Sequence, residues 1–184
     1  MHVLDLGGVP EAWRLAPVRP AHVVTVNLDS RVLSADVPGV TAVVGDACAL
    51  PARLATERFD LVYSNSLLEH VGGHANRVRL AETVRMMSDQ HWVQTPYRYF
   101  PVEPHWLFPA FQFLPLRARA EVSRRWPFGP TRSTDLGAAV GDVAWVELLD
   151  FTAMRQYFPH SEIWPERVVG LPKSLVAVSR AEHI

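Results

Sequence analysis

The sequence predicts an α/β protein built on a doubly wound, mostly parallel β-sheet. Short aliphatic and β-branched runs alternate with helix-compatible stretches through the first half of the chain. Several of these runs end in glycine or a small polar residue, as strands do when their carboxyl ends carry a ligand site. The 184 residues can bury a continuous core, and a composition of 48% apolar and 20% charged residues excludes a disordered chain.

The first half of the chain is expected to supply five strands, at residues 3–6, 22–28, 40–44, 59–64 and 91–95. A short helix is expected at residues 10–15 and a longer one at residues 76–87. The apolar spacing of the longer helix places five side chains near one face: Val78, Leu80, Ala81, Val84 and Met87. Short apolar strands separated in this way favour a parallel sheet covered on both faces.

The second half of the chain differs from the first in its amino-acid composition. Residues 96–115 hold five prolines and seven aromatic side chains, a density that excludes a regular helix or a central strand. Residues 96–116 are therefore expected to form an ordered insertion after the fifth strand. Beyond it we expect a partly helical stretch at 117–141, a helix at 148–158, and an antiparallel pair of strands at 162–170 and 175–179.

Composition excludes several functional classes. The formal charge of -1 leaves no overall basic surface for nucleic acid, although four arginines form a local cluster: Arg117, Arg119, Arg124 and Arg125. A single cysteine, Cys48, excludes a disulfide framework and a Cys-based zinc site. With no recognisable secretory signal before Val3 and no apolar run long enough to span a bilayer, we expect a cytoplasmic protein.

Glycine and polar residues follow the first two expected strands. The first ends in V-L-D-L-G-G, which contains Asp5, Gly7 and Gly8, and glycines there let the backbone approach a ligand closely. The second ends near Asn27 and Asp29, either of which could bond ribose hydroxyls or only cap a turn. The G-x-G-x-x-G spacing of a dinucleotide site is absent, which disfavours a nicotinamide-dependent oxidoreductase.

Two more motifs follow the third and fourth expected strands. V-V-G-D-A-C-A-L-P contains Asp46 and Ala47, and a carboxylate there can accept a hydrogen bond from an adenine amino group. F-D-L-V-Y-S-N-S-L-L-E-H-V contains Asn65, Leu68 and His70. Each motif is weak by itself, but the three occur in order along the sheet.

Together the three motifs resemble the class I S-adenosylmethionine-dependent methyltransferases. More narrowly, they resemble the "type 11" branch similar to the ubiquinone and menaquinone methyltransferases. The resemblance covers residues 2–95, and the closing residues resemble the family's last two strands. It implies a Rossmann-like, seven-stranded sheet with an antiparallel last strand, and bound S-adenosylmethionine. The single domain would comprise a cofactor-binding half at 1–95, an acceptor-side insertion at 96–147 and a closing part at 148–184.

The family pattern also implies roles around the cofactor. Asp5, Gly7 and Gly8 match the residues beside the methionine portion, and Asn27 with Asp29 matches the ribose contact. Asp46 and Ala47 match the adenine contact, and Asn65 to Leu68 match the strand end that lines the methyl-donor cavity. Asn27 stands where the family usually has an acidic residue. The glycine loop departs from G-x-G-x-G, so Trp13 could help to close the pocket. Met1 lies four residues before Asp5, so another segment would replace the family's preceding helix as the cofactor's cover.

Histidine and glutamate supply the candidate catalytic groups. His70 follows Glu69 at the fourth strand end, and a histidine near neutral pKa can remove a proton from a hydroxyl nucleophile, or only shape the pocket. Glu103 and His105, in the insertion, are alternative acid–base candidates. The competing structural role for Glu103 is an ion pair with an arginine, Arg98 or Arg117.

No metal is expected. His70 and His74 have i,i+4 spacing, but Gly72 and Gly73 between them disfavour a helix that could present both to zinc.

The insertion is expected to act as a lid and acceptor wall. Nearest the substrate it would place five side chains: Tyr97, Tyr99, Glu103, His105 and Trp106. The arginine cluster would favour an acidic or phosphorylated acceptor, or a peripheral contact with an anionic membrane. The expected function is methyl transfer to an oxygen or carbon of a small-molecule, sugar or lipid-linked acceptor. A non-catalytic binding or assembly module is the alternative, a homodimer stays open, and nucleic acid is not an expected partner.

Overall fold

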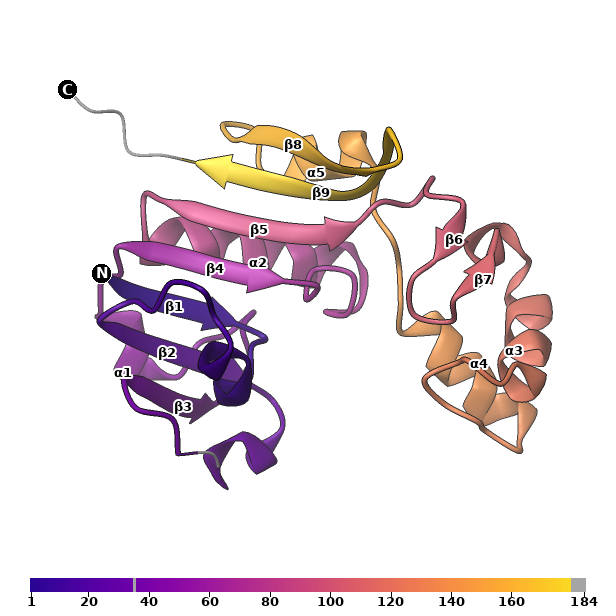
Figure 1. Cartoon of the computed structure of the whole chain (residues 1–184), viewed down its shortest axis with the longest axis horizontal. Helices are drawn as coiled ribbons and strands as arrows, with labels where there is room; N and C mark the ends of the chain where they lie inside the picture. The colour runs from indigo at the N-terminus through magenta and orange to yellow at the C-terminus, as the bar shows by residue number, and fades with distance from the viewer. Residues whose placement is uncertain (35, 180–184) are drawn as a thin grey trace.

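Seven strands form one twisted sheet in the computed structural model, which describes residues 1–34 and 36–179 (Figure 1). The strand order is β3-β2-β1-β4-β5-β9-β8. The strands are β1 (His2–Leu6), β2 (His22–Asn27), β3 (Val40–Val44), β4 (Leu61–Asn65), β5 (His91–Pro96), β8 (Glu162–Val168) and β9 (Leu171–Ser179). β1 to β5 pair in parallel, whereas β9 is antiparallel to both β5 and β8. The expected seven-stranded sheet with an antiparallel last strand is confirmed.

The chain reverses its direction across the sheet at β1. From there it runs outward through β2 and β3, then returns to the other side of β1 at β4 and continues to β5. Such a switch opens a crevice at the carboxyl ends of the strands. The Ser64 hydroxyl donates to the Leu6 carbonyl at 3.0 Å and so holds these two strand ends together.

One face of the sheet carries the main core. Three helices cover it: α1 (Ala52–Ala55), α2 (Gly73–Met87) and α5 (Phe151–Tyr157), of which Figure 1 shows α2 and α5 behind the strands. The apolar stripe predicted for the second helix packs against the sheet, with Leu80, Ala81, Val84 and Met87 buried and Val78 partly buried. Asp150 caps α5 by accepting the Ala153 N–H at 2.9 Å.

The other face of the sheet is covered by short elements. The described residues on this side form two 3₁₀ turns, η1 (Pro10–Arg14) and η2 (Ser30–Ser34). Trp13 of η1 packs edge-on against Tyr63, with the ring centroids 5.8 Å apart, and Tyr63 stacks on Trp92 at 4.9 Å. This face is therefore covered by short 3₁₀ turns, one of them where a short helix was expected over residues 10–15, and by aromatic rings.

The insertion forms a lobe of its own beside the carboxyl ends of the strands (Figure 1). It contains β6 (Val102–Glu103), β7 (Phe108–Pro109), η3 (Phe111–Phe113), α3 (Leu116–Arg125) and α4 (Leu136–Ala144). Its separate core consists of Trp106, Phe111, Ala120, Ala139 and Val143. The proline-rich part has only two-residue strands and a 3₁₀ turn, as its composition predicts, but the lobe packs on itself and not flat over the sheet.

No helix within the described residues combines the length and apolar character that crossing a membrane would require.

Candidate active site

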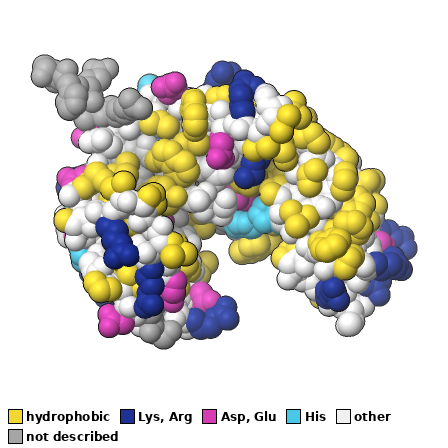
Figure 2. Space-filling model, in the orientation of Figure 1, with side chains coloured by type: hydrophobic (Ala, Val, Ile, Leu, Met, Phe, Trp, Pro, Cys, Tyr) yellow, Lys and Arg dark blue, Asp and Glu magenta, His cyan; other side chains and the backbone are white. Residues whose placement is uncertain are grey.

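A hollow separates the sheet from the insertion lobe, and histidine side chains lie at its bottom (Figure 2). Two cavities open there. The first, of about 270 Å³, lies at the carboxyl ends of the first strands, and the second, of about 580 Å³, lies against the insertion lobe. His70 and Trp145 line both cavities, so the two spaces meet at these side chains.

The first cavity is shaped by glycine at two strand ends. Its lining residues are Gly7, Val26, Asn27, Leu28, Gly45, Asp46, Ala47, Cys48, Leu67, His70, Val71, Asn76 and Trp145. Gly7 has φ +84°, which favours glycine, and a Cβ at Gly45 would lie 2.8 Å from the Pro51 ring. A side chain at either position would collide with Leu67 or Pro51, so glycine lets the two strand ends pack closely where they line the cavity. A volume near the lower end of small-molecule sites suits a nucleoside-sized group.

Asn27 organises the glycine loop. Its Nδ2 donates to the carbonyls of Gly7 at 2.9 Å and Gly8 at 3.2 Å, and its Oδ1 accepts the Asp29 N–H at 3.0 Å. An acidic residue could not make the two donor bonds. The amide is thus suited to holding the loop, at the position where the resemblance implies a ribose contact.

Asp46 and Cys48 form the opposite wall. One carboxylate oxygen of Asp46 accepts the Cys48 N–H at 2.8 Å, and the side chain stays exposed at the cavity. The Cys48 thiol contacts the Asn76 carbonyl at 3.3 Å. Burial, together with the nearby Asp46 charge, raises the pKa of this thiol to about 11, so it remains protonated and is a poor nucleophile.

Five residues expected at the cofactor do not line this cavity: Asp5, Gly8, Asp29, Asn65 and Leu68. Asp5 is buried beneath the glycine loop, against Gly8, and accepts the Trp13 indole N–H at 2.8 Å. Its burial raises its pKa to about 6, although the Trp13 bond acts in the opposite direction.

The other residues outside the cavity have local surroundings that explain their position. Asp29 is turned toward Arg31, whose Nε it binds at 2.7 Å. Leu68 packs into the main core, and the neighbouring Leu67 lines the cavity in its place. Asn65 is exposed at the end of β4. Trp13 covers Asp5 and Tyr63 and does not line the pocket it was expected to close.

The three candidate catalytic residues lie together at the junction of the cavities. His105 Nδ1 is 2.6 Å from Glu103 Oε1, and His105 Nε2 is 3.1 Å from His70 Nε2. Glu103 is buried, and its other oxygen accepts the backbone N–H groups of His105 at 2.8 Å and Trp106 at 2.7 Å. The ion-pair partner of Glu103 is therefore His105, and not Arg98 or Arg117.

The two histidines have opposite proton affinities. Burial and, as a smaller cause, the charge of His105 lower the pKa of His70 to about 4, although the charge of Glu103 acts in the opposite direction. Burial also opposes protonation of His105, but the hydrogen bond and charge of Glu103, with the charge of Glu69, raise its pKa above the ordinary value. When the two imidazoles take up one additional proton, that proton therefore resides on His105.

Glu69 adds a buried carboxylate beside the pair. Its Oε2 accepts the Thr95 hydroxyl at 2.8 Å, and Oε1, without a hydrogen-bond partner, is 3.9 Å from His70 Nε2. The ligand atoms of Glu69, His70 and His105 lie within 4.8 Å of one another, which is the arrangement among the described residues nearest to a metal site. The two histidine nitrogens are at hydrogen-bond distance from each other. His74 is elsewhere, 3.0 Å from the Tyr157 hydroxyl.

The second cavity is mostly apolar and comes largely from the insertion lobe. Its lining residues are His70, His105, Trp106, Pro130, Thr131, Gly141, Asp142, Trp145 and Val146. Tyr97 and Tyr99, expected near the substrate, are not among them, because Tyr97 packs on Phe151 at 5.4 Å and Tyr99 stacks on Phe113 at 5.9 Å. Within the expected acceptor-side insertion, the lining residues between 130 and 146 were not singled out, because nothing in their spacing indicates that the chain returns to the strand ends after α4.

Comparison with known proteins matches residues 4–90 to the family model for a methyltransferase domain. A search of curated proteins finds no match. Among solved structures, a Rhodobacter sphaeroides protein described with the Zn-dependent alcohol dehydrogenases has a TM-score of 0.62 and 15% identity, over 97% of this chain and 83% of that one.

Two solved methyltransferases are also similar over 97% of this chain. The N-methyltransferase NodS from Bradyrhizobium japonicum has a TM-score of 0.55 and 11% identity, with 84% of its chain covered. The magnesium protoporphyrin IX methyltransferase from Synechocystis, with bound SAH, has a TM-score of 0.56 and 12% identity, with 74% covered. At these identities the structural likeness shows a shared fold.

Proposed function

The chain carries a class I S-adenosylmethionine-dependent methyltransferase domain, and from this we propose that it methylates a hydroxyl group of a small-molecule, sugar or lipid-linked acceptor. The observation that carries the proposal is the meeting of two cavities at His70 and Trp145. A donor in the first cavity and an acceptor in the second would approach each other beside the Glu103–His105–His70 chain.

The first cavity suits S-adenosylmethionine. The glycine loop and Asn27 would hold its amino-acid and ribose portions, and Asp46 with Ala47 would face the adenine. Gly7 and Gly45 both line this cavity, and each lets its strand end pack closely, against Leu67 and Pro51 respectively. When bound, S-adenosylmethionine supplies the methyl group, whose bond to sulfur breaks as its bond to the acceptor oxygen forms.

The histidine pair would remove the acceptor proton. Starting from two neutral imidazoles, with His105 protonated only at Nδ1, His70 takes up the hydroxyl proton at its own Nδ1 and passes its Nε2 proton to Nε2 of His105. Glu103 stabilises the resulting imidazolium, because its carboxylate is buried next to His105. Alignment of donor and acceptor would supply most of the rate enhancement, and proton removal would add to it. This base favours oxygen over carbon as the methylated atom.

Isothermal titration of the full chain with S-adenosylmethionine and S-adenosylhomocysteine tests the donor site. We expect both to bind, and the absence of binding by both would overturn the proposal. A panel of hydroxylated acceptors with radiolabelled methyl donor tests turnover. Binding of the donor without transfer to any acceptor would favour the non-catalytic module.

A further inference from the structure

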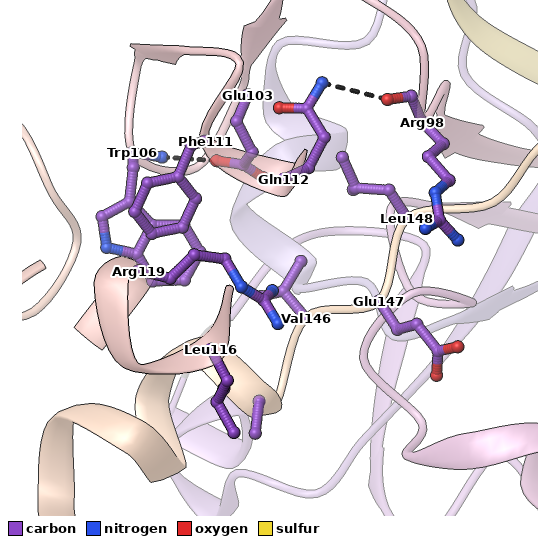
Figure 3. Close-up of a pocket in the computed structure, with 11 residues that line it drawn as sticks. Arg98, Glu103, Trp106, Phe111, Gln112, Leu116, Arg119, Val146, Glu147 and Leu148 are labelled. Carbon is purple, nitrogen blue, oxygen red and sulfur yellow. Dashed lines mark hydrogen bonds between the residues drawn. The ribbon is translucent and has the colours of Figure 1, made fainter. Parts of the chain in front are cut away.

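A third cavity, of about 360 Å³, lies in the insertion lobe beside the second (Figure 3). Trp106 and Val146 line both, so these two side chains form the partition between them. Apart from Glu103 and the two partition residues, the proposed methyl transfer uses none of the residues that line this cavity. Its polar side chains come from the insertion and from the segment after α4: Arg98, Glu103, Gln112, Arg119 and Glu147.

Two buried polar atoms of this cavity lack hydrogen-bond partners. Gln112 donates through Nε2 to the carbonyls of Phe100 at 2.7 Å and Arg98 at 3.0 Å, which fixes the amide and leaves its buried Oε1 unpaired. Arg119 donates weakly from Nη1 to the Val143 carbonyl at 3.4 Å, and its buried Nε is also unpaired. A buried polar atom without a hydrogen bond lowers the stability of the folded protein. A ligand with a donor for Gln112 Oε1 and an acceptor for Arg119 Nε would supply the two missing bonds.

Within the described part of the chain, the carboxylates of the cavity have ion-pair partners and its arginines do not. Among the described residues, neither Arg98 nor Arg119 has a carboxylate oxygen within ion-pair distance. Glu147 pairs with Arg77 at 2.6 Å, and Glu103 is bound by His105. Burial and the charge of Arg98 lower the pKa of Arg119, and the charge of Glu103 acts in the opposite direction. The cavity therefore holds two guanidinium groups that no carboxylate binds directly among the described residues.

In Figure 3 the two guanidinium groups reach into the cavity from opposite sides. A carboxylate or phosphate group between them could accept hydrogen bonds from both, in the paired geometry that arginine forms with either anion. The remaining wall is apolar: Trp106 stacks on Phe111 with centroids 4.7 Å apart, and Leu116, Val146 and Leu148 complete it.

We propose that this cavity binds the carboxylate or phosphate group of a ligand with an apolar body, held by Arg98 and Arg119, while Gln112 accepts a hydrogen bond from the same ligand. The anion site is argued from the geometry of this cavity alone. We assign it to the acidic end of the methyl acceptor because Trp106 and Val146 separate it from the proposed acceptor cavity, and this assignment rests on the proposed function.

Of the four clustered arginines in the sequence, the structure places only one in this cavity. Arg124 and Arg125 both pair with Glu121, at 3.4 Å and 2.6 Å, and Arg117 is exposed. Only Arg119 of that cluster lines the cavity, and Arg98, from the segment after β5, is the second cation.

Binding of benzoate and phenyl phosphate to the full chain, followed by ligand-observed NMR and calorimetry, tests the anion site, and the two probes show which anion is preferred. Benzamide, which is neutral and similar in shape to benzoate, is the ligand control. We expect Arg119→Gln to weaken binding of the preferred anion by about tenfold or more, with Arg98→Gln acting in the same direction. Arg117→Gln, on the same helix, should stay within about twofold of the unmodified chain.

Equal binding of benzoate and benzamide, or equal affinity in Arg119→Gln and the unmodified chain, would overturn the anion site. Because Arg98 is exposed, Arg98→Gln keeps the test decisive if Arg119→Gln does not fold. Affinity for S-adenosylhomocysteine, measured on the same variants, should not change. Anion binding without methylation of any acceptor would leave the site standing and count against the proposed function.

Discussion

His105 Nε2 lies 3.1 Å from His70 Nε2, with the two rings perpendicular, although 35 positions separate them in the chain. One histidine belongs to the turn after β4 and the other to the insertion lobe. Glu103 fixes His105 from behind at 2.6 Å. The contact therefore joins the proposed donor side of the site to its acceptor side through a single pair of nitrogens.

Replacing Glu103 by glutamine should lower the pKa of His105. In the unmodified chain, the Glu103 hydrogen bond and charge outweigh burial and raise that pKa above its ordinary value of about 6.5. Without the negative charge, His105 should lose its proton at a lower pH. Titration of the imidazole resonances by ¹H–¹⁵N NMR measures this shift, and an unchanged His105 titration would contradict the relay.

The same titration with added Zn²⁺ examines the neighbouring carboxylate. If the histidine pair acts as a proton relay, micromolar Zn²⁺ should leave the His70 and His105 resonances in place. Tight binding that is lost in Glu69→Gln would instead assign a metal to this cluster and contradict the relay.

Asp46→Ala should weaken binding of S-adenosylhomocysteine by roughly 1.5–3 kcal/mol, the usual cost of losing a hydrogen bond to a charged acceptor. Asp29→Ala is the matched control, because Asp29 lies outside the cavity and bonds to Arg31. Calorimetry on both folded variants measures the difference. If the two substitutions reduce affinity equally, Asp46 does not contact the adenine.

Asn27→Asp should destabilise the glycine loop. A carboxylate at this position would face the carbonyl oxygens of Gly7 and Gly8, to which the amide now donates. The free energy of unfolding should fall by about 1–3 kcal/mol, and binding of S-adenosylhomocysteine should weaken with it. Urea denaturation and calorimetry provide the two readouts. Tighter binding in the aspartate variant would show that ribose recognition outweighs the loop contacts.

Asp5→Asn should stabilise the ligand-free protein above pH 6. Burial raises the pKa of Asp5 to about 6, so the folded state holds this proton more tightly than the unfolded chain does. Its contribution to stability is therefore present at low pH and is lost as pH rises from about 4 to about 6, by up to about 3 kcal/mol.

Asparagine stays neutral and can still accept the Trp13 N–H. The difference in unfolding free energy between Asp5→Asn and the unmodified chain should therefore grow over that pH interval. Urea denaturation at several pH values measures it, and a constant difference would mean that Asp5 has an ordinary pKa.

The core strands and the glycine-lined end of the sheet were accessible from the amino-acid order. Alternating apolar runs end at Gly7 and Gly45, and the strands begin and end within a few residues of the predicted positions. These signals are local, because strand periodicity and the backbone freedom of glycine act over a few neighbouring residues. Gly7, Asn27, Asp46 and Ala47, which these signals mark, line the first cavity.

Tertiary packing decided which of the other polar residues meet. Trp145 joins the two cavities, Arg98 faces Arg119, and His105 reaches His70 only because the insertion folds around its own core beside the strand ends. Conversely, Asp5 and Leu68 are removed from the cavity by the Trp13 bond and by the main core. Such long-range contacts depend on how two separately packed cores come together, and no spacing along the chain encodes that arrangement.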